Sequence, residues 1–377
     1  MRLLNRQRNI IDFTLSSLLR RKRKNTALVL VYTLVVFGLA SVIFSTQALK
    51  HEACSILQKS PEVVIQRVVA GRQELIPASY IDKVKDIRGV QSAQGRFWGY
   101  YYDSTVGANY TLMVSNEPSG AEGSMVIGKG VARTLHAEKG DIVPFRAYDG
   151  SIVTLQVGYI LSVQSELVSS DLVLLTENDF RQITGVPKGA FTDIAVMARN
   201  PKELTIIAEK IRRLFPDTRP IIKDDILRTY ETIFDWRGGI LLVILAGAML
   251  AFVILAWDKA SGLSSEERKE IGILKGIGWE TSDVILMKFW EGVVISLSSF
   301  LLGCVFAYVH IFFASSALFE PVLKGWSVLY PQFRLKPYID PLQIATLFSL
   351  TVIPYTVATI IPSWRAATMD PDSVMRL

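Results

Sequence analysis

The stretch "RRKRKNTALVLVYTLVVFGLASVIFSTQAL", residues 20–49, passes directly from five consecutive basic side chains into a long apolar run. An α-helix needs about 20 apolar residues to cross the hydrocarbon core of a bilayer. Residues 27–49 contain no charged side chain. The stretch therefore predicts a membrane-spanning helix, and the basic cluster before it predicts that its N-terminal end lies in the cytoplasm.

Three further stretches are long and apolar enough to span a bilayer, in a chain of 377 residues of which 50% are hydrophobic. The predicted spans are residues 27–49, 237–257, 289–313 and 341–364. A cleaved signal peptide is the alternative for the first run, but that run exceeds the about 7–15 residues of a signal-peptide core and no A-x-A site follows it. The predicted fold class is an α-helical membrane protein with four transmembrane helices, arranged as one plus three, and an extracytoplasmic mixed α/β domain between the first and the second.

The placement of basic side chains orients these spans. Residues 1–26 hold most of the local positive charge, with Asp12 as their single acid. The positive-inside rule puts both termini in the cytoplasm of a multi-pass protein of the inner, or plasma, membrane. The remaining segments are 1–26, basic and amphipathic; 50–236, the extracytoplasmic domain with helical stalks; 258–288, cytoplasmic; 314–340, an extracytoplasmic loop without an assigned role; and 365–377, a cytoplasmic tail.

The first segment predicts a helix on the inner leaflet. Ile11, Leu15 and Leu18 share one helical face by their spacing. Such a basic amphipathic helix lies in the membrane interface and attracts anionic lipid. A plain flank of the first span is the alternative. Because the basic cluster abuts a spanning helix, membrane lipid is the expected partner and nucleic acid is not.

The extracytoplasmic segment has the mixed pattern of an α/β domain. Residues 77–90 predict a short helix and a turn at Gly89, and residues 130–145 predict a helix that ends at Gly140 and leads into a strand. Strands are predicted within 100–115, 151–161 and 171–179, which are rich in aromatic and β-branched residues. A further amphipathic helix is predicted at 201–216, with Leu204, Ile207, Ile211 and Leu214 on one face.

One stretch of this segment, "GSMVIGKGV" at residues 123–131, comes close to a phosphate-binding loop. Gly123, Gly128 and Lys129 match the G-x-x-x-x-G-K-[ST] pattern, but Gly130 replaces the required hydroxyl residue. The predicted location outside the membrane also lacks a supply of nucleotide. We therefore expect Gly128 and Gly130 to serve a turn. The sequence predicts no catalytic residue, no metal site and no cofactor.

The segment between the second and third predicted spans indicates a two-faced helix. Ser264 and Glu267 form a predicted capping box at its start, and Thr281 or Ser282 is expected to cap the next helix. The acids of the first turns favour the positive helix end, and Lys275 favours the other end. The residues that share one face are Ile271, Leu274 and Ile277, and the expected helix breakers are Gly276 and Gly278. Because anionic lipid would repel the acidic start, a protein partner fits better.

Small residues recur along one face of the third predicted span. They are Gly292, Ser296, Ser299, Gly303 and Ala307. This spacing predicts close packing against neighbouring helices, with chance as the alternative. Glu291 is the one acid within a predicted span. An acid at this depth is a candidate coupling residue, although pairing with Lys288 is the competing interpretation.

Four stretches resemble the FtsX/MacB-type permeases, the membrane subunits of ABC transporters that work by mechanotransmission. "EERKEIGILKGIGWETSDVI" (266–285) is similar to the coupling helix of that family. "FTLSSLLRRKRKNTALVL" (13–30) resembles its amphipathic N-terminal helix, "VIGKGVARTLHAEKGDIV" (126–143) part of the MacB-like periplasmic core domain, and "IPSWRAATMDPDSVMRL" (361–377) the C-terminal ending. The outer segment is shorter than in the full exporter type, which argues against a complete second subdomain.

The resemblance implies a noncatalytic permease subunit. Its implied partners are a separate cytoplasmic ABC ATPase, a second permease copy or paralogue, and a periplasmic adaptor. ATP-driven motion would pass through the coupling helix and the stalks at about 47–60 and 221–237 to the outer domain, for export or extraction of substrate. The residues expected to dock on the ATPase are Glu266, Glu267, Arg268, Glu270, Ile271, Leu274, Lys275, Gly276 and Gly278.

Three alternatives to substrate export remain open at this point. The same architecture fits a regulator of cell-wall hydrolases, a permease that releases lipoproteins as half of a hetero-pair, and a membrane sensor that works without an ATPase. The substrate is not encoded in any pattern described above.

Overall fold

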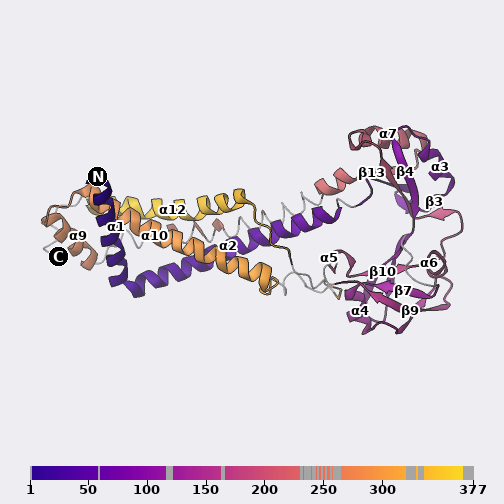
Figure 1. The fold of residues 1–377 in the computed structure, drawn as a ribbon, viewed down its shortest axis with the longest axis horizontal. Coiled ribbons are helices and arrows are strands. Elements are labelled where there is room, and N and C mark those ends of the chain that lie inside the picture. Colours follow the sequence, from indigo (N-terminus) through magenta and orange to yellow (C-terminus); the bar gives the residue numbers. More distant parts are fainter. Residues whose placement is uncertain are drawn as a thin grey trace. The chain divides into compact units, whose positions relative to one another are not determined.

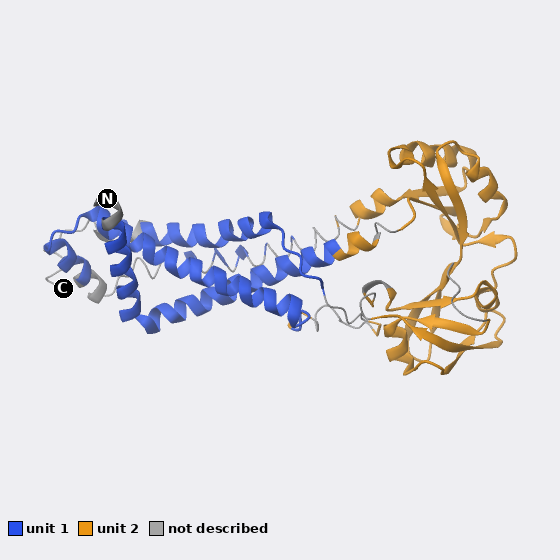
Figure 2. Ribbon diagram, viewed as in Figure 1, with its two compact units in different colours: residues 1–51, 233–317, 335–377 blue, residues 52–232, 318–334 orange. Residues whose placement is uncertain are grey.

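The computed structural model divides the chain into two compact units, coloured separately in Figure 2. Unit 1 comprises Met1–His51, Ile233–Ala317 and Leu335–Leu377, and unit 2 comprises Glu52–Thr232 and Leu318–Arg334. The structure describes residues 2–57, 60–115, 122–162, 166–229, 265–319, 328–329 and 335–367, together with isolated residues between 232 and 257.

Unit 1 is built from long helices (Figure 1). Its described elements are α1 (Arg2–Arg20), α2 (Lys22–Leu57), which enters unit 2 after His51, α9 (Ser265–Gly276), α10 (Thr281–Tyr308) and α12 (Pro341–Ala367). The last turn of α10 widens into a π-helix, η3 (Val309–Phe313). At 1.5 Å per residue the 36 residues of α2 extend about 54 Å, well beyond the about 30 Å of a hydrocarbon core.

The apolar runs form helices where the sequence predicts them. Among the described residues, three helices are long and apolar enough to cross a membrane: Lys22–Ile56, Thr281–Phe313 and Pro341–Ile360. They coincide with the first, third and fourth predicted spans. The second, 237–257, lies mostly outside the described residues, and those described there are helical. The prediction of a membrane protein is thus supported, while the number of four spans stays a prediction.

The small-residue stripe lies inside the helix bundle of unit 1. Its buried members are Gly292, Ser296, Ser299, Gly303 and Ala307. A Cβ atom on Gly303 would lie 2.7 Å from Cβ of Val36 in α2, and one on Gly292 would lie 2.7 Å from Oγ1 of Thr359 in α12. The Ser299 hydroxyl donates to the Val29 carbonyl at 3.2 Å. The stripe therefore lets α10 approach α2 and α12 closely.

Unit 2 contains an antiparallel sheet in the order β13-β1-β12-β4, with β2 on β1. These strands are β1 (Val63–Val69), β2 (Arg72–Glu74), β4 (Val90–Arg96), β12 (Asp193–Ala198) and β13 (Thr218–Ile222). Alternate β1 residues, Val63 and Ile65, are buried in one core with residues of α3 (Ser79–Lys85) and α7 (Leu204–Leu214). Val63 pairs with Ile222, so the strand that begins this sheet and the strand that ends it lie side by side.

A second, six-stranded sheet is inserted between β4 and β12, in the order β5-β6-β10-β7-β9-β8. Its strands are β5 (Trp98–Asp103), β6 (Ala108–Val114), β7 (Ser124–Ile127), β8 (Ile142–Arg146), β9 (Ile152–Ile160) and β10 (Leu172–Leu175). Its helices are α4 (Lys129–Leu135), α5 (Glu166–Ser169) and α6 (Glu177–Thr184). The short strands β3 (Ile76–Pro77) and β11 (Ala190–Phe191) pair separately, and a 3-10 turn, η2 (Pro201–Glu203), precedes α7. The short outer segment thus holds two complete sheets, contrary to the expectation from its length.

Asp193 joins the two sheets where the chain passes between them. Its carboxylate accepts two hydrogen bonds of 2.7 Å from the Arg96 guanidinium and one of 2.8 Å from the Trp98 indole. Phe191 packs against both hydrophobic cores. Asp193 is buried and its pair with the half-exposed Arg96 is bidentate, and because bidentate pairing requires a specific geometry, these contacts fix the junction.

Two details of the outer helices differ from the sequence-based expectation. The helix expected to end at Gly140 ends at Leu135, because His136 adopts a left-handed conformation with φ of 52° and Ala137 N–H bonds to the Ala132 carbonyl. In α7, Leu214 is exposed, and Phe215 takes its place in the core. Strict 3.6-residue periodicity from Leu204 favours position 215 over 214.

Gly128 and Gly130 are required by close backbone approach rather than by a turn. Gly128 has an ordinary φ of −68°, but a Cβ atom there would lie 1.7 Å from the Ser169 carbonyl oxygen. A Cβ atom on Gly130 would lie 2.1 Å from the Ser170 hydroxyl. Residues 124–127, the middle of the "GSMVIGKGV" motif, form the strand β7. They therefore do not form a phosphate-binding loop.

Replacing Gly128 by alanine is expected to destabilise unit 2 strongly. The new methyl group would overlap main-chain atoms that cannot rotate away, and overpacking of this kind costs about 3 kcal/mol. Thermal unfolding of the purified full chain measures the effect. Gly99→Ala is the matched control, because its Cβ atom would meet only Phe180 Cζ at an ordinary 3.8 Å. Equal stability of the two variants would contradict the packing described here.

Candidate functional site

The helix α9 forms a short arm between the second predicted span and α10. It ends at Gly276, and Gly278, two residues later, takes a φ of 100°, a conformation that favours glycine. The Gly278 N–H bonds to the Lys275 carbonyl, and the Trp279 N–H bonds to the Leu274 carbonyl at 3.0 Å. These bonds close the helix in the manner of a glycine C-cap. The chain therefore turns sharply from α9 into α10.

One face of α9 is buried within unit 1. Ile271 and Leu274 are 6% and 5% exposed. Ile271 packs with Val284 of α10, and Leu274 packs with Ile10 of α1 and Met287 of α10. Burying two such side chains contributes about 3–6 kcal/mol before the loss of side-chain freedom. The apolar face of α9 therefore attaches the helix to its own chain.

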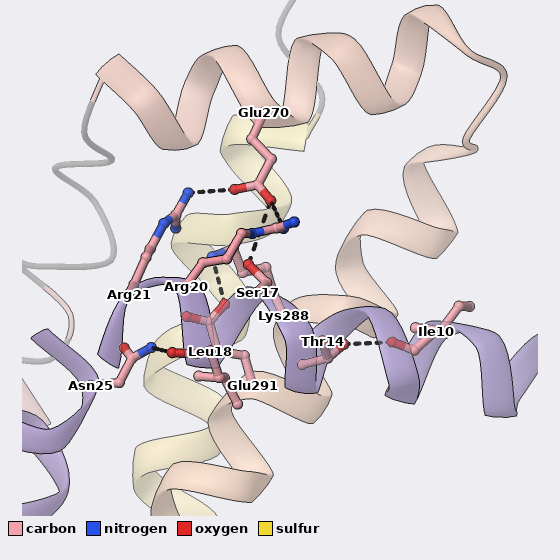
Figure 3. Close-up of polar contacts among 10 residues, drawn as sticks. All are labelled: Ile10, Thr14, Ser17, Leu18, Arg20, Arg21, Asn25, Glu270, Lys288 and Glu291. Carbon is pink, nitrogen blue, oxygen red and sulfur yellow. Dashed lines mark hydrogen bonds and ion pairs between the residues drawn. The ribbon is translucent and has the colours of Figure 1, made fainter. Parts of the chain in front are cut away.

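The Glu270 carboxylate holds the same helix to the end of α1 and to Arg21, which lies between α1 and α2. Figure 3 shows Glu270 pointing from α9 toward Ser17, Arg20 and Arg21. Arg20 Nη2 lies 2.7 Å from one Glu270 carboxylate oxygen, and the Arg21 guanidinium pairs with the other. The Ser17 hydroxyl reaches the first oxygen at 3.5 Å. With both carboxylate oxygens engaged, Glu270 is a positioning residue, which limits its availability to a partner.

The beginning of α10 is tied to α1 by a second cluster. Arg6 donates to Asp283 at 2.6 Å and pairs with Glu280 at 3.2 Å. The hydrogen bond to Asp283 raises the pKa of Arg6 above its usual value. Glu280 and Asp283 form the capping box of α10, so the prediction that Thr281 or Ser282 is the cap is wrong. The predicted Ser264–Glu267 capping box falls on residues whose side chains lie outside the described part.

The face of α1 that packs on the chain differs from the predicted apolar face. Ile10 and Thr14 are buried. Phe13 packs against the cluster that contains Ile10, and the ring centroids of Phe13 and Trp279 are 5.2 Å apart. Leu15, by contrast, is exposed. The buried face of α1 is the one that contacts α9 and α10. The spacing of apolar residues within α1 carries no information about where these two helices lie.

Among the described side chains at the C-terminal end of α9, those opposite Ile271 and Leu274 are exposed. Ile273 and Ile277 are 53% and 71% exposed, and Gly276 and Gly278 are also exposed beside them. Two large aliphatic side chains exposed on a short, doubly anchored helix form a compact apolar knob. Such a knob is suited to insertion in a groove of a partner protein. We call Ile273, Gly276, Ile277 and Gly278 the α9 knob.

The residues predicted to dock on the ATPase differ in their exposure. Gly276 and Gly278 are on the exposed side, and Lys275 is half-buried. Ile271 and Leu274 are internal, so in this structure they are packing residues and not a free surface. The main chain of Glu266, Glu267 and Arg268 is helical and part of α9, but their side chains lie outside the described part. Ile273 was missed because it lies off the apolar face that periodicity identifies.

Glu291 has a partner on its own helix. Lys288 donates to Glu291 Oε2 at 2.6 Å, and both side chains are largely buried (Figure 3). An ion pair at i and i+3 lowers the cost of holding both charges near the membrane boundary. The pairing interpretation therefore describes this conformation, and a coupling role for Glu291 stays a prediction.

Comparison with known proteins gives one family match. Residues 238–371 match the model of the FtsX-like permease C-terminal domain, a range that contains α9, α10 and α12. A search of curated protein sequences finds no match.

Two solved structures are similar in part. One is the extracellular domain of the noncanonic ABC-type transporter YknZ from Gram-positive bacteria, at 13% identity and a TM-score of 0.30 over 43% of this chain and 100% of that chain. The other is the periplasmic region of MacB from Actinobacillus actinomycetemcomitans, at 10% identity and a TM-score of 0.32 over 45% of this chain and 92% of that chain.

Proposed function

Because the region 238–371 of this chain belongs to the FtsX-like permease family, we propose that the protein is the membrane subunit of an ABC transporter that transmits motion from a separate cytoplasmic ATPase to unit 2. The basic cluster at Arg20–Lys24 supports a cytoplasmic position for α1 and α9. Unit 2 is then extracytoplasmic. ABC ATPases act as pairs, so a second copy or a paralogue of this chain completes the assembly.

The observation that carries this proposal is the attachment of α9. Its inner face and Glu270 are bound to α1 and α10, while the α9 knob is exposed. A force applied to the knob is therefore transferred to the first helix and the third span together. A loosely attached loop would absorb that force instead.

The strand order of unit 2 supports the second step of the proposed transmission, from the membrane helices to unit 2. The strand β1 follows α2 along the chain, and β13 precedes the second predicted span. Val63 and Ile222 are paired neighbours, and Lys223 N–H bonds to the Glu62 carbonyl at 2.9 Å. A change in the separation of the two membrane helices would therefore act on two adjacent strands of one sheet. Substrate need not pass through this chain in such a mechanism.

Charging the α9 knob is expected to prevent ATPase binding. The double variant Ile273→Asp with Ile277→Asp places two carboxylates where apolar side chains would be desolvated, at a cost of several kcal/mol for an unpaired buried charge. We expect co-purification of the ABC ATPase with the full chain to fall at least 100-fold. The chain itself should remain folded, since both positions are exposed.

A matched control comes from unit 2. Ile206 on α7 is 57% exposed, so Ile206→Asp makes the same chemical change on a surface that this proposal does not use. Retention of the ATPase by the knob variant, at the level of Ile206→Asp, would contradict the proposal and favour a sensor that works without an ATPase.

A further inference from the structure

The face of α1 that points away from α9 exposes two leucines. Ile10 packs on α9 and α10, whereas Leu15 and Leu19 are 42% and 73% exposed. At 3.6 residues per turn, Leu15 and Leu19 lie about 140° and 180° around the helix from Ile10. Two exposed leucines one turn apart on a basic helix are suited to insertion into the surface of a bilayer.

The position of α1 in unit 1 agrees with such a surface. It ends at Arg20, and α2, which begins at Lys22, is long and apolar enough to span a membrane. In Figure 1, α1 runs across the end of the bundle that contains α2, α10 and α12. The charged side chains exposed on the same face as the leucines are Arg8, Asp12 and Arg23. Because positive charge is in excess there, the face attracts anionic lipid.

Arg20 lies at the border between this face and α9 (Figure 3). Its Nη2 atom donates to Glu270 at 2.7 Å, and its guanidinium carbon lies 5.5 Å from the ring centroid of Phe13. The side chain is nevertheless 58% exposed. Within the part of the chain that the structure describes, its Nε and Nη1 groups have no hydrogen-bond partner. Arg20 is therefore held in place with donors still available.

A guanidinium in this position can serve two anions at once. It presents five N–H donors in a rigid planar fork, so it can pair with a carboxylate on one side and a phosphate on another. Glu270 and Phe13 already order the side chain, which lowers the entropic cost of binding a second anion. The five consecutive basic residues 20–24 offset the repulsion between a phosphate and Glu270.

We propose that Arg20, with Leu15 and Leu19 inserted beside it, binds the phosphate of an anionic phospholipid in the inner leaflet, and that this lipid strengthens binding of the ATPase to the α9 knob. The lipid and Glu270 hold the same guanidinium, so each fixes its orientation for the other. Because coupling between two sites is reciprocal, ATPase binding also tightens lipid binding. The inference rests on the proposed function, which supplies the ATPase and the cytoplasmic position of α1.

Thermal unfolding of the detergent-solubilised full chain, without ATPase, tests the lipid site by itself. We expect phosphatidylglycerol to raise the midpoint by about 3 °C more than phosphatidylcholine does. Arg20→Lys should abolish this difference, because one ammonium group cannot reproduce the fork, while the matched control Arg23→Lys should keep it. Soluble glycerol 3-phosphate should have no effect. A shift with glycerol 3-phosphate equal to that with phosphatidylglycerol, or an undiminished lipid effect in Arg20→Lys, overturns the lipid site.

Titration of the chain with the ATPase in nanodiscs tests the coupling. Nanodiscs of phosphatidylcholine alone are compared with nanodiscs of phosphatidylcholine and phosphatidylglycerol in equal amounts. We expect phosphatidylglycerol to tighten ATPase binding about tenfold in the unmodified chain and in Arg23→Lys, and by less than about twofold in Arg20→Lys. Equal affinity in the two lipids for the unmodified chain, or the same lipid dependence in both variants, overturns the coupling alone. Absence of ATPase binding in either lipid overturns the proposed function, and the coupling with it.

Discussion

Replacement of Glu270 by lysine is expected to weaken ATPase binding about 30-fold. The change removes a carboxylate that pairs with Arg20 and Arg21 and adds a third cation beside them. Loss of a hydrogen-bonded charge contact costs about 2 kcal/mol, which is about 30-fold in an equilibrium constant. We expect α9 to detach from α1 in part, so that binding must first restore its position. Titration of the solubilised chain with the ATPase measures the change.

Two controls separate positioning from direct contact. Glu209 on α7 also pairs with two arginines, Arg212 and Arg213, so Glu209→Lys is a matched charge reversal and should leave binding unchanged. A chain that combines Glu270→Arg with Arg20→Glu and Arg21→Glu should recover most of the affinity. Failure of this charge swap would indicate that the ATPase contacts Glu270 itself.

Replacement of Gly303 by valine is expected to disrupt the contact of α10 with α2. A Cβ atom added at this position would lie 2.7 Å from Val36 Cβ and 3.0 Å from the Phe37 backbone nitrogen. Overpacking costs about 1–3 kcal/mol, and the backbone neighbour allows little relief. We expect the thermal midpoint of the detergent-solubilised chain to fall by about 5 °C, with Gly303→Ala intermediate.

Gly247→Val is the matched control for this prediction. Gly247 lies in the second predicted span and is helical, and a Cβ atom there would meet nothing within 4 Å. Its midpoint should change little, because the same side chain is added without an overlap. A similar loss for both variants would mean that helix propensity, and not the α2–α10 contact, sets the effect.

The features that follow from local sequence were predicted well. The apolar runs that became α2, α10 and α12 are properties of consecutive residues. The small-residue stripe was found because helix periodicity alone puts Gly292 and Gly303 on one face. The family match over 238–371 likewise agrees with the resemblance first noted in the α9 region.

The features that were missed depend on contacts between distant residues. Glu270 and Arg21 are separated by 249 positions, so their pairing is invisible to spacing rules. The basic cluster that contains Arg20 and Arg21 predicts membrane topology, and it says nothing of a side-chain partner. Ile271 and Leu274 share a buried face as predicted, but the prediction that Ile277 lies on the same face is wrong, because Ile277 follows the last residue of α9 and is exposed. Periodicity also cannot tell whether Leu274 packs inward or binds a partner. The structure assigns Leu274 to the interior and leaves Ile273 and Ile277 exposed.

The most direct test of the central claim is the footprint of the ATPase on this chain. Hydrogen–deuterium exchange of the full chain in lipid nanodiscs would be compared with and without its co-purified ABC ATPase. The account predicts that peptides covering 270–280 become protected when the ATPase binds, since the α9 knob is then buried. Binding of the ATPase with no protection in 270–280 would contradict it.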